Sequence, residues 1–165
     1  MGQVCRYCES SLNAEQDRFI TGGLCASCAG DVLSTRENTQ RFIDSFGDPI
    51  LFMQGDPRLV VTANQKASAL FGKELSRIQG QRGGKVFDCI HSFSELGCGL
   101  DPNCQDCKIK NAVVETFTQQ KASTRIYTVL DIFRDNQTTP YHMEVTTEPI
   151  GDFGLIRIDR YRPKG

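Results

Sequence analysis

Residues 48–72 read DPILFMQGDPRLVVTANQKASALFG, and this stretch decides the fold. It begins with two apolar runs, residues 49–53 and 59–61, on either side of the turn sequence Gly-Asp-Pro-Arg at 55–58. Short apolar runs that flank a turn containing Gly and Pro are typical of paired strands. The stretch therefore predicts a β-hairpin.

A short helix is expected directly after this hairpin. Asn64 is a residue type that caps helix N-termini, and Gly72 suits the left-handed position just past a helix C-terminus. Between them, one helical face carries the apolar side chains of Ala67, Leu70 and Phe71. The remaining pattern predicts a helix over 29–46, continuous or broken within 34–39, a helix over 108–119, and strands over 124–134, 141–150 and 153–161.

The order of these elements, with the segments DPILFM, LVVTAN and ASALFG in succession, resembles the PAS domain family. The resemblance covers residues 36–162 and implies a five-stranded antiparallel sheet with helices between its second and third strands. The expected fold class is therefore α+β. We expect a PAS-like sensory domain with flanking helices over residues 35–165, after a small zinc-ribbon-like module over residues 1–34.

Half of the eight cysteines form two Cys-x-x-Cys pairs with 16 residues between them, here called the outer group: Cys5, Cys8, Cys25 and Cys28. Each pair brings two thiolates to one ion, and two pairs complete a tetrahedral site. Because protein fills all four positions, such a site is structural and has no open place for a substrate. The outer group therefore predicts a structural zinc ion, which a module this small needs for stability.

The other four cysteines, here called the inner group, lie where the resemblance places a ligand pocket and a long helix: Cys89, Cys98, Cys104 and Cys107. Glycines and a proline among them supply turns that let the thiolates converge on a second metal site. Its uneven spacing suits a second zinc or an iron–sulfur cluster, and spacing does not separate the two. Two alternatives stay open: Cys89 as a core residue, and His91 in place of one thiolate.

Charge and composition argue against several classes of protein. Lys and Arg total 19 against 20 Asp and Glu, and the first thirty residues show no basic face, so no nucleic-acid binding is expected. No run approaches the roughly 20 apolar residues that cross a bilayer, and the beginning of the chain lacks an export-signal pattern. We expect a cytoplasmic protein without membrane contact, in which cysteines bind metal in preference to forming disulfides.

Three other patterns carry no chemistry that we recognise. Residues 80–85, GQRGGK, lack the spacing of a phosphate-binding loop and predict a plain loop. Asn103-Cys104 matches only the start of the Asn-Cys-Arg-Phe-Leu-Gln sequence expected of flavin-binding light sensors, and neither His91 nor His142 lies in the long helix where a haem-binding relative would carry its ligand. Without a recognisable catalytic set of side chains, no enzyme activity is expected.

The expected function is a cytoplasmic signalling sensor or protein-interaction module. An iron–sulfur cluster at the inner group would make it a redox or oxygen sensor, whereas zinc would make it a rigid adaptor. Output would pass through a homodimer or a separate kinase or regulator. Two alternatives stay open: a small iron–sulfur electron carrier, and a zinc-dependent nucleic-acid or transcription accessory protein.

Overall fold

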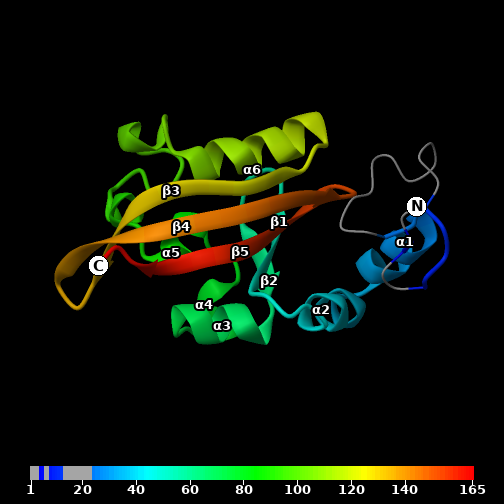
Figure 1. The fold of residues 1–165 in the computed structure, drawn as a ribbon. Helices are drawn as coiled ribbons and strands as arrows, with labels where there is room; N and C mark the ends of the chain where they lie inside the picture. Colours follow the sequence, from blue (N-terminus) through cyan, green and yellow to red (C-terminus); the bar gives the residue numbers. More distant parts are fainter. Residues whose placement is uncertain (1–3, 6–7, 13–23) are drawn as a thin grey trace.

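The computed structural model describes residues 4–5, 8–12 and 24–165. Its centre is an antiparallel sheet with the strand order β2-β1-β5-β4-β3 (Figure 1). The strands are β1 (Ile50–Gln54), β2 (Val60–Ala63), β3 (Ser123–Arg134), β4 (Gln137–Ile150) and β5 (Phe153–Pro163). The expected hairpin is the β1–β2 pair, and the expected five-stranded antiparallel sheet is confirmed.

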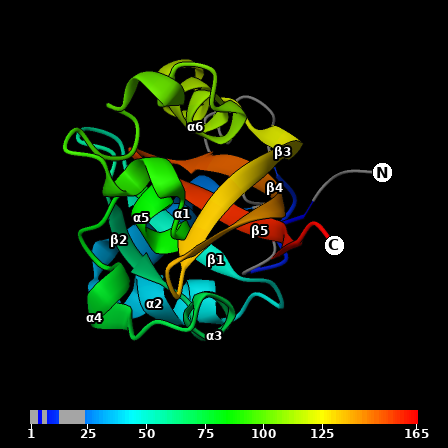
Figure 2. The same ribbon diagram turned by 90° about the vertical axis from the view of Figure 1, so that its left-hand side faces the viewer.

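The segments between β2 and β3 are helical and pack against one face of the sheet, where their apolar side chains form the main core. They are α3 (Gln65–Phe71), α4 (Leu75–Ile78), α5 (Gly83–Phe87), the 3-10 turns η1 (Ile90–Phe93) and η2 (Pro102–Cys104), and α6 (Lys108–Gln119). Figure 2 shows α5 and α6 on the same side of the long strands. The prediction of a plain loop at 80–85 was wrong at its end, because α5 begins at Gly83. No helix of the described residues is both long and apolar enough to cross a membrane.

Strand β1 is buried on both faces, which explains its unbroken apolar sequence. Leu51 and Met53 belong to the main core, whereas Ile50 and Phe52 belong to a second core on the opposite face. Successive side chains of a strand point to opposite faces, so one apolar run serves both cores.

Asn64 joins three elements at the start of α3. Its side-chain Oδ1 accepts hydrogen bonds from the N–H groups of Ile50 (2.9 Å) and Ala67 (3.0 Å). Its Nδ2 donates to the carbonyl oxygens of Ile43 (3.0 Å) and Asp48 (2.8 Å). The residue is 1% exposed, and these bonds satisfy the polar atoms that burial removes from water. The cap at Asn64 and the left-handed end at Gly72, with φ of 62°, are confirmed.

The helix expected over 29–46 is broken into α1 (Ala26–Ser34) and α2 (Arg36–Asp44). Thr35 separates them, because its extended backbone ends α1 while its side chain accepts the N–H of Asn38 at 3.0 Å and caps α2. Both helices contribute to the second core against Ile50 and Phe52. The expected domain boundary at 34/35 thus falls between two helices that share one apolar cluster. Residues 13–23 of the expected module lie outside the described residues.

The hairpin between β3 and β4 turns on only Asp135 and Asn136, whose φ angles are 52° and 60°. Such a two-residue turn with positive φ at both positions matches the twist of the flanking strands. Strand β4 therefore begins earlier than the expected 141 and includes Pro140, which pairs with Asp131. The Pro140 carbonyl accepts the N–H of Lys164 at 2.8 Å, a role that needs no N–H from the proline.

Candidate metal centres

The outer group converges as its spacing predicts. The sulfur atoms of Cys5, Cys8, Cys25 and Cys28 all lie within 4.8 Å of one another. Tetrahedral zinc with Zn–S bonds of about 2.3 Å separates its sulfurs by roughly 3.8 Å. Cys8 Sγ and Cys25 Sγ are 3.8 Å apart, so the group has the dimensions of a four-thiolate zinc site.

Local backbone structure positions these sulfurs. A tight turn follows Cys5: its N–H donates to Ser10 O and its carbonyl accepts the N–H of Glu9, both at 2.7 Å. Cys25 is the N-cap of α1, and its sulfur accepts the N–H of Cys28 at 3.5 Å. Each Cys-x-x-Cys pair therefore sits on a tight turn or at the first turn of a helix, where backbone N–H groups stabilise thiolate charge.

The two ends of the outer group differ in electrostatics. The pKa of the exposed Cys8 thiol is lowered, mainly by its hydrogen bond with the Ser10 hydroxyl 3.2 Å away. Burial raises the pKa of the Cys28 thiol, which lies among the side chains of the second core. A zinc ion stabilises all four thiolates by its own charge, including the buried one.

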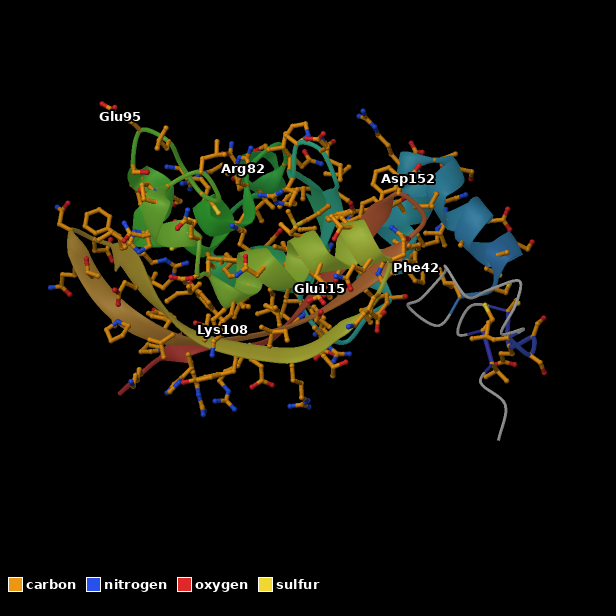
Figure 3. All side chains as sticks on the ribbon, turned by 90° about the horizontal axis from the view of Figure 1, so that it is seen from above. Phe42, Arg82, Glu95, Lys108, Glu115 and Asp152 are labelled. Carbon is orange, nitrogen blue, oxygen red and sulfur yellow. The ribbon has the colours of Figure 1, made fainter. Side chains whose placement is uncertain are left out.

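The inner group reaches one cavity from four separate segments. Cys89 precedes η1, Cys98 lies in the loop between Gly97 and Gly99, Cys104 ends η2, and Cys107 is the N-cap of α6. All four line a cavity of about 240 Å³ that is bounded by β1, β3, β5, α5 and α6. Figure 3 shows Arg82, just before α5, and α6, marked by Lys108 and Glu115, on the same side of the curved sheet.

Although the inner sulfurs share this cavity, they do not converge as the outer ones do. Among the described residues, the outer group is the one set whose ligand atoms come together closely enough for a single metal ion, and Cys89, Cys98, Cys104 and Cys107 form no such set. They are nevertheless close enough for charge on Cys98, Cys104 or Cys107 to raise the pKa of Cys89. The expected second group therefore meets in space, but with a wider spacing than one zinc ion imposes.

Burial controls the ionisation of the inner thiols. Cys89 is 9% exposed, and burial is the main cause that raises its pKa to about 11. Burial also raises the pKa of Cys98. These thiols stay protonated at neutral pH unless a cationic centre binds them. Cys89 is thus buried, as its expected role as a core residue requires, and it lines the cavity, while its role as a metal ligand stays a prediction.

Sequence reasoning missed three residues that shape this cavity: Gly84, Arg58 and Arg82. Gly84 donates its N–H to Cys98 Sγ at 3.2 Å. The guanidinium groups of Arg58 and Arg82 lie beside Gly99, since a Cβ built on that glycine would be 3.3 and 3.5 Å from them. The pair Gly83-Gly84 at the start of α5 was the only local sign in the sequence of a close approach by another segment. Nothing in the sequence near Arg58 or Arg82 indicated that they line the cavity.

His91 also lines the cavity. Its Nδ1 lies 4.0 Å from Asp101 Oδ1, and its side chain is about a third exposed. Asp101 caps η2 by accepting the N–H of Asn103 at 2.8 Å. The histidine is thus placed at the rim beside the turn that carries Cys104, where replacement of a thiolate remains a prediction.

The sheet and its helical layer are similar to solved structures of sensory domains. The LOV protein of Rhodobacter sphaeroides superposes on 75% of this chain with a TM-score of 0.50 and 14% sequence identity. The fold is that of a PAS domain. The superposition covers 65% of the Rhodobacter chain, less than two thirds of its length.

Two PAS domains from other proteins are also similar. That of nitrogen regulation protein NR(II) from Vibrio parahaemolyticus matches 74% of this chain and 96% of its own, with 16% identity and a TM-score of 0.49. That of the fruit-fly ELK potassium channel matches 76% of this chain and 97% of its own, with 10% identity and a TM-score of 0.48. No family model and no curated protein matches the sequence. The PAS fold rests on the Rhodobacter superposition and on the strand order of the sheet. At 14% identity, the ligands and partners of the Rhodobacter protein cannot be assigned to this chain.

Proposed function

We propose that this chain is a signalling sensor module whose input site is a metal centre held by the inner group inside the PAS fold. The observation that carries the proposal is the convergence of four cysteines, from four segments spread over residues 89–107, on one cavity beneath α6. A common cavity supports a shared ligand.

The outer group serves this module as a structural staple. Its four sulfurs have zinc dimensions, and α1 extends from Cys25 into the second core. A metal ion there holds α1 and α2 against the face of β1 and β5 that carries the second core. We propose zinc for this site because a closed four-thiolate set leaves no position for a reacting molecule.

A change at the inner site has a direct route into the sheet. Cys89 forms an isolated β-bridge with Ile132 of β3, and the adjacent Asp88 carbonyl accepts the N–H of Phe133 at 2.8 Å. The Asp88 carboxylate pairs with Lys73 at 2.7 Å and with Arg134 at 2.6 Å. Movement of Cys89 on metal loss therefore acts on the edge strand β3 and on α3 at once.

We further propose that the chain is not an enzyme, that it acts in the cytoplasm, and that its output passes to a second copy of itself or to a separate kinase or regulator. No nucleic-acid partner is proposed, because the formal charge is balanced at −1. An electron carrier is the competing function. It is favoured by the partly exposed position of Cys98 in a glycine-flanked loop.

Hydrogen–deuterium exchange on the intact chain tests the sensor. The wild-type protein, purified without oxygen, is compared with Cys104→Ala. Metal binding at the inner site should slow exchange in residues 94–107, and also around Ile132 in β3, because Cys89 bridges to that strand. Slower exchange confined to 94–107 would support a carrier or a staple, and would contradict transmission to the sheet.

A further inference from the structure

We infer that the inner cavity binds an iron–sulfur cluster and not a single zinc ion, a conclusion that rests on the proposed function of the inner group as a metal centre. The residues assigned to it are Cys89, Cys98, Cys104 and Cys107 as ligands, and Arg58, Arg82 and Lys110 as the cations around them. Two independent measures, sulfur spacing and cavity volume, separate the two kinds of centre.

The first measure is the spacing of the sulfurs. In this chain the outer group brings four sulfurs within 4.8 Å of one another, as a single zinc ion requires. The inner cysteines line one cavity, yet among the described residues they form no such set. In a cluster each thiolate binds one iron and the thiolates are divided over two or four irons, so four sulfurs do not surround one ion. The inner cysteines therefore lack the single-ion arrangement of the outer group, and their wider placement around one cavity leaves room for a centre of several atoms.

The second measure is the volume that the sulfurs enclose. The cavity measures about 240 Å³. A cavity needs only about 10–15 Å³ to hold one water molecule. A lone metal ion would therefore leave most of this cavity unfilled. Pockets for organic ligands usually occupy about 300–1,000 Å³, which places this cavity below the range for a flavin. A group of several iron and sulfide atoms falls between the two.

The wall of the cavity suits an anionic centre of this kind. Arg58 and Arg82 approach the Cys98 loop at Gly99, and Lys110 lies on the first turn of α6. Two carboxylates, those of Asp106 and Asp131, also line the cavity and oppose the charge of these cations. Two backbone N–H groups donate to ligand sulfurs, from Gly84 to Cys98 at 3.2 Å and from Lys110 to Cys107 at 3.5 Å. Hydrogen bonds to sulfur and nearby positive charge are two means by which proteins tune cluster potentials.

Apolar side chains complete the wall: Met53, Phe87, Ile109, Val113, Leu130 and Ile156. They limit solvent access from the sheet side, whereas Cys98 and Cys107 are partly exposed. Oxygen or another small oxidant would reach the cluster near these two ligands.

The test is elemental analysis of the full chain, purified without oxygen, for iron, acid-labile sulfide and zinc. Iron and sulfide in equal numbers, at two or four per chain, together with about one zinc, would support the cluster. Cys104→Ala should then lose iron and sulfide to background and keep its zinc. Cys28→Ser should lose zinc and keep the iron and sulfide.

Two zinc ions without iron would overturn the cluster but leave the proposed inner metal centre standing. One zinc ion alone, lost in Cys28→Ser and kept in Cys104→Ala, would overturn both. If either variant fails to fold, the metal-free wild type is incubated with ferrous iron and sulfide, or with zinc alone, without oxygen. Visible charge-transfer absorption that excess zinc does not displace would support the cluster. Uptake of two zincs in place of any iron would contradict it.

Discussion

The sulfur of Cys98 lies against the backbone of Gly84, from which it accepts an N–H hydrogen bond at 3.2 Å. A Cβ on residue 84 would stand 2.6 Å from that sulfur and 2.9 Å from the Cys98 Cβ. Contacts this short are not tolerated, so a side chain at position 84 would force Cys98 or α5 to move. Glycine at position 84 lets α5 approach the cysteine loop this closely.

Gly84→Ala should displace Cys98 and lower the metal content of the inner site, although alanine is the better helix former by about 1 kcal/mol. Elemental analysis of the anaerobically purified variant measures this. The matched control is Gly83→Ala in the same helix, where the added Cβ would lie 3.5 Å from the Phe87 ring, an ordinary contact. If both variants contain the same amount of metal at the inner site, the Gly84 contact does not position Cys98.

Cys28→Ser should remove the outer zinc and release α1, while the PAS sheet still unfolds in one transition. The reason is that the proposed zinc would be bound by cysteines of this module and of α1, whereas the main core contains no residue of α1 or α2. Zinc content and urea unfolding followed by circular dichroism measure the two effects. Ser27→Ala, at an exposed position of the same turn, should retain zinc. Simultaneous loss of zinc and of the sheet's transition would show that the second core cannot be separated from the first.

Asp88→Asn should lower the free energy of unfolding by about 1–3 kcal/mol. The change leaves the Lys73 ammonium, whose side chain is 11% exposed, without its anionic partner, and weakens the tie to Arg134. The backbone is not strained, since Asn tolerates the left-handed φ of 62° at this position. The expected loss is moderated because Lys73 also donates to two backbone carbonyls.

Urea unfolding of Asp88→Asn is best compared with Glu115→Gln. Glu115 pairs with Lys121 at 3.6 Å, but both side chains are exposed, so this variant should differ from wild type by less than about 0.5 kcal/mol. If the two variants lose equal stability, Asp88 is not the link between α3 and β3 that its contacts indicate.

The metal-free protein should lose stability as the pH rises from 9 to 11. Burial raises the pKa of Cys89 from 9.0 to about 11, so the folded state keeps a proton that the unfolded state releases. A group that binds more protons when folded makes stability fall with rising pH across this window. The contribution is about 1–2 kcal/mol, and Cys89→Ala should remove it.

Urea midpoints measured at several pH values with chelator and reductant reveal this slope. Cys8→Ala is the control, because the pKa of Cys8 is lowered and its thiol cannot cause an alkaline loss. An unchanged slope in Cys89→Ala would assign the alkaline loss to other groups.

The hairpin and the helix caps could be predicted because they depend on neighbours in the sequence. Asn64, Gly72 and the helix at Lys108–Gln119 were placed correctly from residue type and spacing alone. The Cys-x-x-Cys pairs of the outer group belong to the same category, since each pair is set by one turn. The break at Thr35 was left open, because a polar stretch permits either a continuous helix or a capped pair.

The sequence by itself thus determined the succession of strands along the chain, the helices at 65–71 and 108–119, the convergence of the outer cysteines and the residue types of the inner group. Only the tertiary structure decided the spacing of the inner sulfurs, the contact of Gly84 with Cys98, and the pairing of Asp88 with Arg134 across 46 residues. The physical reason is that backbone propensities and caps act over a few residues. The width of a cavity is set by how two cores, sharing strand β1, hold distant segments against the sheet.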